Sequence, residues 1–499
     1  MTARTDWTTF AAASRWPASP HYSRHRPSTQ RVGGLAILHL RNIADQGMEM
    51  VRPIRFFASC ALVMVVAAGL TPPDAGAATA IMSAVLPNGA TVMTRQRVGS
   101  QVLAIDVAVR AGARYEQVQT ASATRFLESA LMMGTERWPT RDALTRSISA
   151  RGGDLSVSAG REIVEVAVTV GLSDASLALD VLGDVLLRSR FDPNDLERER
   201  TVILQQVQER EDEPEDRATD LFFQTIFAGH PLTNLPSGTS DGVEALTVEE
   251  LQGYWQSRLV GPNVLISVVS GLPHDDVVAL LAEALADMPR GPVPSVNYDD
   301  IPVAVPSTFE LPLGSDQSHI LIGAPIPGVS STDRAPLRVL NAVLGRSSGR
   351  LFTEIRDKRG LAYSTYSSLS QFVDGGVFLV YVGTRPSSAD AVLDLVKTEL
   401  QRVRDEPLDS VELQNAIGGE IGARILAVET SANEALYTAR DTMFGVPPRE
   451  IQAERTRAVT AADVQRVARQ YLDPSRLSVV MTRPPSVENA MPAGAEVLP

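Results

Sequence analysis

Apolar and polar residues alternate along the chain with two periods, which predict strands interleaved with longer helices. A period of two predicts half-buried strands, and it occurs at residues 91–94, 102–109, 163–170 and 264–269. Apolar residues about three or four positions apart predict amphipathic helices, and this spacing occurs at residues 140–151, 174–188, 193–208 and 248–258. The pattern therefore predicts an α+β fold.

The same succession of elements repeats after a proline-rich run, residues 288–306, which interrupts the periodicity and is typical of a linker. The segment LTVEELQGYW parallels VTAADVQRVARQYL, so that Thr247 lies 213 positions before Thr460. Likewise, DASLALDVL parallels SADAVLDLV, and Asp174 lies 214 positions before Ser388. Nearly equal offsets predict one duplicated unit of roughly 210 residues.

Length and composition agree with more than one domain. The chain has 499 residues, of which 44% are hydrophobic, and this suffices for more than one core. We expect an N-terminal domain at residues 78–287, the linker, a C-terminal domain at residues 307–485 and a flexible tail at residues 486–499. The net charge of -13 argues against nucleic acid and anionic membrane surfaces as partners.

The start of the chain has the features of processing segments. Residues 1–49 are rich in Arg, Ser and His and lack apolar periodicity, which predicts a disordered or mis-started extension, with a transit peptide as the alternative. From Met50, a basic start, an apolar run at residues 56–70 and the small residues Ala75, Gly76 and Ala77 predict a signal peptide over residues 50–77.

This signal peptide predicts a mature chain that begins near Ala78 and is periplasmic or secreted. Two alternatives are lipidation at Cys60 and retention of the apolar run as an anchor. Cys60, however, precedes most of the apolar run, and it is the only cysteine of the chain. No disulfide framework or cysteine-based metal site can therefore form.

The most informative motif is Arg125-Phe126-Leu127-Glu128-Ser129, on an amphipathic run just after a predicted strand. It follows the pattern H-x-x-E-H, in which two histidines one helical turn apart bind Zn²⁺ and the Glu polarises the bound water. Both histidine positions differ here. Arg125 carries a permanent positive charge that repels Zn²⁺, and Ser129 is a poor zinc ligand. Without a metal, we expect Glu128 to pair with Arg125.

Further landmarks follow in order, and together they resemble the pitrilysin/insulinase-type zinc peptidases over nearly all of residues 86–483. They are His230-Pro231-Leu232 with Ser237-Gly238-Thr239, LTVEELQGYWQSRLVGPNVLISVVSG at residues 246–271, and RLFTEIRDKRGLAYS at residues 350–364. The family takes a third zinc ligand, a Glu, from a second helix. Residues 197–214 resemble that helix, and the ligand position falls on Gln206, whose neutral amide cannot replace a carboxylate.

The resemblance implies two homologous α/β halves, each with a mixed sheet plus helices, that close like a clamshell, and it implies that two such chains enclose a chamber. It also implies that Arg356 and Tyr363, seven positions apart, hold substrate and stabilise the reacting carbonyl. A guanidinium and a phenol are strong donors for such a group. The alternative is that Arg356 pairs with Asp357 or Glu354 and that Tyr363 belongs to the core.

Histidines offer no replacement for the lost zinc site. After the predicted cleavage only His230, His274 and His319 remain, and no two have the spacing of metal ligands on a helix. We expect His230 to be a helix-end or packing residue and the other two to lie at the surface or on edge strands. The acidic run at residues 209–216 predicts a solvated helix end rather than a cation site.

Three functions remain. The first is a zinc-less, catalytically inactive subunit, with no metal of its own, that pairs with a zinc-bearing homologue to form a periplasmic metallopeptidase acting on peptides. The second is a peptide-binding or scaffold protein without proteolysis, as in the core subunits of respiratory complexes. The third is an active hydrolase with non-standard ligands. Whether the chain forms a homodimer or a heterodimer stays open.

Overall fold

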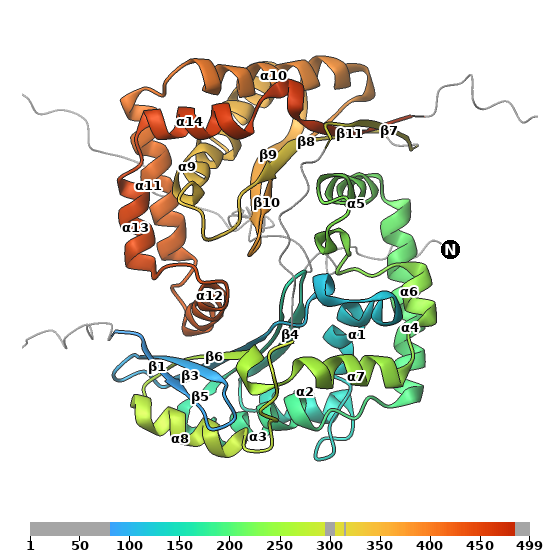
Figure 1. Cartoon of the computed structure of the whole chain (residues 1–499), viewed down its shortest axis with the longest axis vertical. Coiled ribbons are helices and arrows are strands. Elements are labelled where there is room, and N and C mark those ends of the chain that lie inside the picture. The colour runs from blue at the N-terminus through green and yellow to red at the C-terminus, as the bar shows by residue number, and fades with distance from the viewer. Residues whose placement is uncertain (1–79, 295–304, 314–315, 485–499) are drawn as a thin grey trace, which may run out of the picture. The chain divides into compact units, whose positions relative to one another are not determined.

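The computed structural model describes residues 80–294, 305–313 and 316–484 (Figure 1). The predicted N-terminal extension, signal peptide and C-terminal tail, and most of the predicted linker, lie outside the described residues. In the described part of the chain, no helix combines the length and apolar character that a membrane span requires.

The first sheet is mixed, as expected, and contains six strands in the order β1-β2-β6-β3-β5-β4. Their bounds are Met82–Val85 (β1), Thr91–Gln96 (β2), Val102–Val109 (β3), Asp154–Ala159 (β4), Val164–Gly171 (β5) and Val264–Ser270 (β6). The pair β2 and β6 is parallel and the other pairs are antiparallel. Strand β3 is central, and every residue after its first is buried, so both faces of the sheet are covered there.

Alternate residues of β3 enter two different cores. One face of the sheet packs in a large cluster with α3 (Ala175–Leu187) and α8 (His274–Ala284). The opposite face carries small residues, among them Ala104 and Ala108, and there α12 (Ser431–Met443) packs with its own Ala435 and Ala439. Small side chains on both partners allow a helix to approach a sheet closely.

The second sheet has five strands in the order β7-β11-β8-β10-β9. Their bounds are Thr308–Pro312 (β7), Ser318–Ile326 (β8), Ala362–Gln371 (β9), Gly376–Thr384 (β10) and Ser478–Arg483 (β11), and only β7 and β11 are parallel. One face packs against α9 (Arg334–Gly345), α10 (Ala389–Asp405) and α14 (Ala461–Tyr471). The other face packs against α5 (Pro214–Ile226), which inserts Phe222.

Two helices are exchanged between the sheets. Helix α5 lies in the sequence between β5 and β6 but packs against β8 and β11, whereas α12 lies between β10 and β11 but packs against β3 and β6 (Figure 1). Arg440 of α12 binds the buried carboxylate of Glu165 on β5 through two nitrogen atoms. Each sheet therefore depends on a helix from the other part of the chain.

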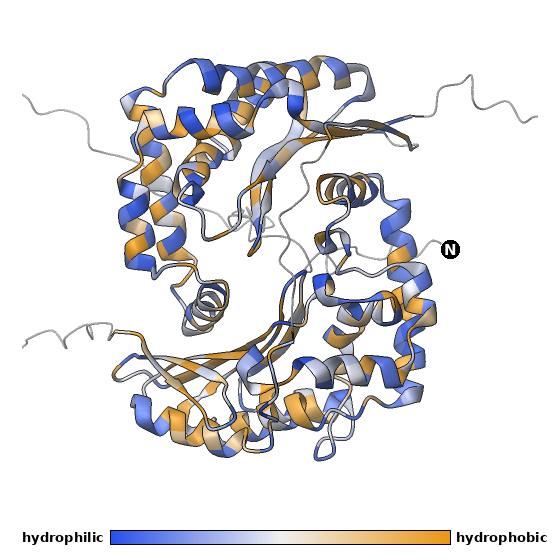
Figure 2. Ribbon diagram, viewed as in Figure 1, coloured by the Kyte–Doolittle hydropathy of each residue, from blue (hydrophilic) through white to orange (hydrophobic). Residues whose placement is uncertain are grey.

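The remaining helices are α1 (Ala123–Ala130), α2 (Arg141–Ser149), α4 (Pro193–Asp212), α6 (Ser240–Ala245), α7 (Val248–Arg258), α11 (Ser410–Leu426) and α13 (Arg449–Arg457). Their outward sides are mainly hydrophilic, whereas the strands are largely hydrophobic (Figure 2). The predicted duplication has a local counterpart, because Thr247 and Thr460 form the same capping box at the start of α7 and α14.

One expectation about the strands was wrong. His319 is buried on β8, a central strand, rather than on an edge strand or at the surface. Its Nδ1 lies 2.8 Å from the hydroxyl of Tyr381 on the neighbouring strand β10. Local sequence identifies a strand but not its neighbours, because strand order depends on long-range pairing.

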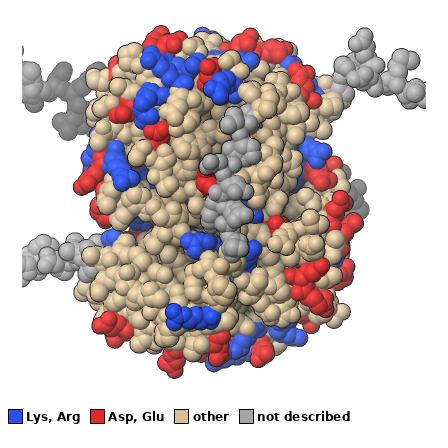
Figure 3. All heavy atoms as spheres, viewed as in Figure 1, with Lys and Arg blue, Asp and Glu red and all other residues tan. Residues whose placement is uncertain are grey.

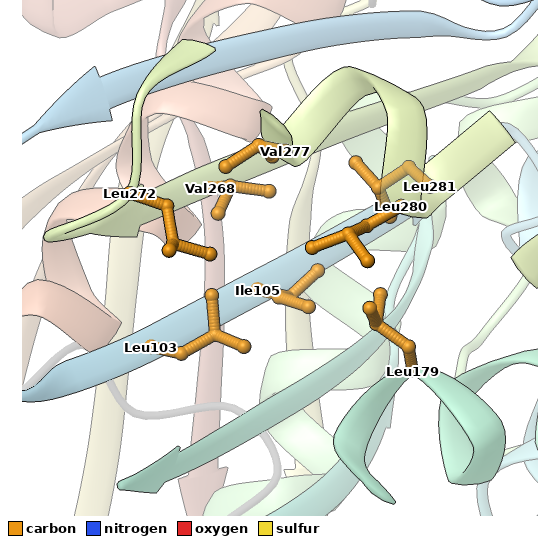
Figure 4. A pocket seen from close by; sticks show the side chains of 8 residues that line it. All are labelled: Leu103, Ile105, Leu179, Val268, Leu272, Val277, Leu280 and Leu281. Carbon is orange, nitrogen blue, oxygen red and sulfur yellow. The ribbon is translucent and has the colours of Figure 1, made fainter. Parts of the chain in front are cut away.

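A small apolar pocket lies between the first sheet and its helices α3 and α8 (Figure 4). Its lining consists of eight aliphatic side chains, including Leu103, Leu179 and Leu281. The space at its centre is about 10 Å³, which is roughly the room for one water molecule. With no polar group in its lining, this pocket is a packing gap rather than a ligand site.

Candidate functional site

The degenerate motif lies on α1, which is held at its start by a carboxylate from outside the helix. Ser122, the residue before α1, has a left-handed backbone conformation with φ of 69° and makes no side-chain cap. Instead, the carboxylate of Glu116 accepts hydrogen bonds from the backbone N–H groups of Ser122 at 2.9 Å and Thr124 at 2.7 Å. A carboxylate is favourable at a helix N-terminus, so Glu116 fixes the position of the motif.

The structure brings the predicted site residues of α1 and α4 together. Nη2 of Arg125 donates to Oε1 of Gln206, and Nη1 lies 3.4 Å from Oε2 of Glu128, which is the ion pair expected from the sequence. Ser129 is buried and donates its hydroxyl to the backbone carbonyl of Phe126 at 3.1 Å. The guanidinium thus joins the residues at the positions of the general base and the third metal ligand.

These residues do not fit a zinc ion. A permanent cation occupies the space between the ligand positions, the Gln206 oxygen accepts from that cation, and the Ser129 hydroxyl is bound within its own helix. In residues 80–294, 305–313 and 316–484, no group of three or more His, Cys, Asp or Glu side chains is arranged to hold a metal ion.

The electrostatics of Glu128 include one residue that the sequence analysis did not identify. Burial raises the pKa of Glu128, Arg125 opposes this shift, and the carboxylate of Glu199 on α4 adds to it. Glu199 lies seven positions before Gln206, which places it two turns away on the same face of α4. That spacing is the signal that would have revealed it.

The duplicated half contains the same arrangement of an arginine and an acceptor. Arg338 of α9 lies 213 positions after Arg125, and Glu420 of α11 lies 214 positions after Gln206. Nε of Arg338 donates to Oε1 of Glu420 at 2.5 Å. In both halves, therefore, an arginine links two helices, α1 to α4 in the first half and α9 to α11 in the second. These helices carry the positions that correspond to the zinc ligands.

The second pair of predicted site residues, Arg356 and Tyr363, is also assembled. Arg356 lies in the last turn of the short π-helical segment η6 (Phe352–Asp357), and Tyr363 lies on the edge strand β9. The guanidinium carbon of Arg356 is 5.2 Å from the centre of the Tyr363 ring, within the range of a cation–π contact. Tyr363 is 78% exposed, so the pair faces solvent.

This geometry contradicts the alternative in which Arg356 forms an ion pair and Tyr363 belongs to the core. Glu354 is bound instead by Lys358 at 2.5 Å and by Arg359 at 2.6 Å. Gly360, with φ of +61°, ends the turn by donating its N–H to the carbonyl of Arg356, as expected of a C-cap.

His230 has the packing role expected from the sequence. It is buried at the start of a short helical turn, and its Nδ1 accepts a hydrogen bond from the N–H of Leu232 at 3.2 Å. Its Nε2 therefore carries the proton and donates to Asp374 at 3.1 Å. His274, the first residue of α8, lies 2.7 Å from the hydroxyl of Thr94.

Comparison with known proteins connects these arrangements to one family. Over 410 residues the chain is 31% identical to a protein of Mycobacterium tuberculosis (strain ATCC 25618 / H37Rv) named "uncharacterized zinc protease", and the match spans 81% of this chain and 93% of that relative. Residues 91–240 match the family model described as "Insulinase (Peptidase family M16)". The chain belongs to the insulinase family, M16. Residues 245–419 of this M16 chain match the model described as "Peptidase M16 inactive domain".

Other proteins match over a similar share of the chain. An "uncharacterized zinc protease" of Streptomyces coelicolor is 31% identical over 78% of this chain and 86% of its own. A crystal structure titled as a peptidase M16 inactive domain from Pseudomonas fluorescens has a TM-score of 0.77 at 18% identity, and covers 82% of this M16 chain and 99% of its own. The structure of a protease from Helicobacter pylori has the same TM-score at 20% identity, and the match covers 81% of this chain and 100% of that protease. Both solved structures share the two-sheet α+β fold.

Proposed function

We propose that the chain is a zinc-less, catalytically inactive subunit that pairs with a zinc-bearing M16 homologue, and that Arg356 and Tyr363 bind substrate in the assembled peptidase. The observation that carries this proposal is the guanidinium of Arg125 between Glu128 and Gln206. The zinc would belong to the partner chain. The predicted signal peptide favours a periplasmic or secreted location.

Arg356 and Tyr363 are present although the zinc ligands are not. This combination favours a supporting subunit over a chain that has lost all of its site residues. An aromatic ring that is 78% exposed adds little to the folded state through burial, so its presence beside a guanidinium favours a role in binding. Both groups can donate hydrogen bonds to a peptide carbonyl. Several relatives are named zinc proteases, and a homologue of that kind would supply the metal and the base.

The surface charge agrees with a peptide or protein partner. Acidic and basic side chains are interspersed over the face shown in Figure 3, and the net charge of the chain is -13. A nucleic-acid partner would instead favour a continuous basic surface.

The test is a peptidase assay with a quenched fluorogenic peptide, combined with a zinc determination by mass spectrometry. The chain, a homologue with intact H-x-x-E-H, and their mixture are assayed separately. We expect a zinc-free, inert chain and an active mixture whose rate falls about tenfold or more with Arg356→Ala or Tyr363→Phe. Tyr366→Phe, which removes a hydroxyl three residues further along β9, is the matched control.

Two results would overturn the proposal. If the chain alone binds one zinc ion and cleaves the peptide, the conclusion drawn from Arg125, Ser129 and Gln206 is wrong. If mixing increases neither activity nor complex formation, a scaffold or peptide-binding role without proteolysis replaces the supporting role.

A further inference from the structure

A second pocket of about 260 Å³ lies on the first half of the chain, between the segment that precedes α1 and the helix α7. One wall is the loop that follows β3 and contains Tyr115 and Thr120, and the other is the helix α7 with Tyr254, Ser257 and Arg258. Unlike the apolar gap beside α8, this pocket combines two aromatic rings, hydroxyl groups and a guanidinium. Such a mixture is typical of small-ligand sites.

The guanidinium of Arg258 lies between the two tyrosine rings. Its carbon is 4.9 Å from the ring centre of Tyr115 and 5.5 Å from that of Tyr254, and Nη2 donates to the backbone carbonyl of Tyr115 at 3.1 Å. Nε and Nη1 are buried and have no hydrogen-bond partner among the described residues. No carboxylate of the described residues forms an ion pair with Arg258, whereas Arg114, Arg210 and Arg440 all bind carboxylates.

A negative group lies at the other end of the pocket. Glu250 also lines it and precedes Arg258 on α7 by eight residues, which corresponds to roughly 12 Å along the helix axis. One oxygen of Glu250 accepts hydrogen bonds from the N–H and the hydroxyl of Thr247, both at 2.9 Å. The pocket thus presents a positive end and a negative end, which disfavours a dianion such as phosphate and suits a single carboxylate.

We propose that this pocket binds a carboxylate group of a peptide, held by Arg258, with the adjoining apolar side chain in the open space beside Gly253. A guanidinium that forms no ion pair with the described carboxylates matches the planar geometry of a ligand carboxylate, and the buried rings of Tyr115 and Tyr254 hold that guanidinium in place. Thr120 and Ser257 also line the pocket, and a hydroxyl oxygen that already takes part in one hydrogen bond can accept another from a peptide N–H group. This site is independent of the proposed zinc-bearing partner, because it lies within this chain alone.

The test is ligand-observed NMR titration of the chain with three probes. N-acetyl-leucine has a terminal carboxylate, N-acetyl-leucinamide lacks it, and the α-amide of N-acetyl-glutamate has a side-chain carboxylate only. We expect the first probe to bind at least about tenfold more tightly than the amide, because a charge-assisted hydrogen bond is lost with the carboxylate. The third probe distinguishes a peptide C-terminus from an acidic side chain as the source of the carboxylate.

Two variants and a control connect binding to this pocket. Arg258→Gln should weaken binding of N-acetyl-leucine about tenfold or more. Gly253→Leu should also weaken it, since Gly253 lines the pocket and a side chain there meets open space, while helix propensity improves. Arg137→Gln alters an arginine that stacks on Trp138 elsewhere, at 4.9 Å, and should leave affinity unchanged. Equal binding of acid and amide, no saturable binding, or full binding by both pocket variants would overturn the proposal.

Discussion

The link between Arg125 and Gln206 predicts a measurable coupling energy. Replacing Arg125 with Met removes the donor but keeps an unbranched side chain, and replacing Gln206 with Leu removes the acceptor at similar volume. Each single change leaves the other group without its hydrogen bond. The double change removes both, and so it should cost less than the sum of the two single changes.

The magnitude follows from burial and charge. A hydrogen bond to a charged group contributes about 1.5–3 kcal/mol to the free energy of unfolding. The ion pair with Glu128 adds little, about 0–1 kcal/mol, because its atoms are 3.4 Å apart and the Glu128 side chain is 34% exposed to screening by water. We therefore expect Arg125→Met to lower the free energy of unfolding by about 2 kcal/mol, with a coupling energy to Gln206 of about 1–2 kcal/mol.

The assay is urea unfolding of the parent chain, the two single variants and the double variant, followed by circular dichroism and by tryptophan fluorescence. Free energies of unfolding are compared when the two probes give the same transition. A control cycle uses Arg137 and Asp180, an exposed ion pair at 2.7 Å whose side chains are 59% and 44% exposed. Its coupling energy should stay below about 0.5 kcal/mol. A coupling between Arg125 and Gln206 no larger than that of the control would refute the reasoning.

Three further changes test the site and the fold. The triple change of Arg125→His, Ser129→His and Gln206→Glu should give about one zinc ion per chain by mass spectrometry, and a parent chain with equal zinc content would contradict the role of the arginine. Burial raises the pKa of Glu116 from 4.5 to about 7, so the folded chain holds a proton that the unfolded chain has released between these values, and stability should fall by about 3 kcal/mol as the pH rises through this window. Glu116→Gln should flatten that pH dependence in thermal unfolding, and an unchanged slope would exclude Glu116 as its source. Arg440→Met leaves a buried carboxylate on β5 without its partner and should cost about 3–5 kcal/mol in urea unfolding, whereas a loss below about 1 kcal/mol would show that the pair does not anchor α12.

Most helices and strands could be predicted because their signals are local. Asp192 followed by Pro193 marks the start of α4, and Thr247 with Glu250 marks the start of α7. The positions of Arg125 and Ser129 followed from the motif, that of Gln206 followed from the resemblance to the peptidase family, and the structure brings Arg125 into contact with Gln206.

Features that depend on tertiary contacts could not be predicted. The central position of His319 and the exchange of α5 and α12 arise from pairings between distant segments. The pocket around Arg258 depends on Tyr115, which lies 143 positions earlier in the chain, although Tyr254 and Arg258 have the i, i+4 spacing of neighbours on a helix.

The exchange of helices also has a consequence for synthesis of the chain. When β6 has left the ribosome, the first sheet has all its strands, but α12 begins only at Ser431, about 160 residues after β6 ends at Ser270. At roughly 5–20 residues per second, that interval lasts about 8–32 s. Throughout it, the face of the sheet that carries Ala104 and Ala108 has no cover from its own helix, so the nascent chain exposes a surface that chaperones recognise.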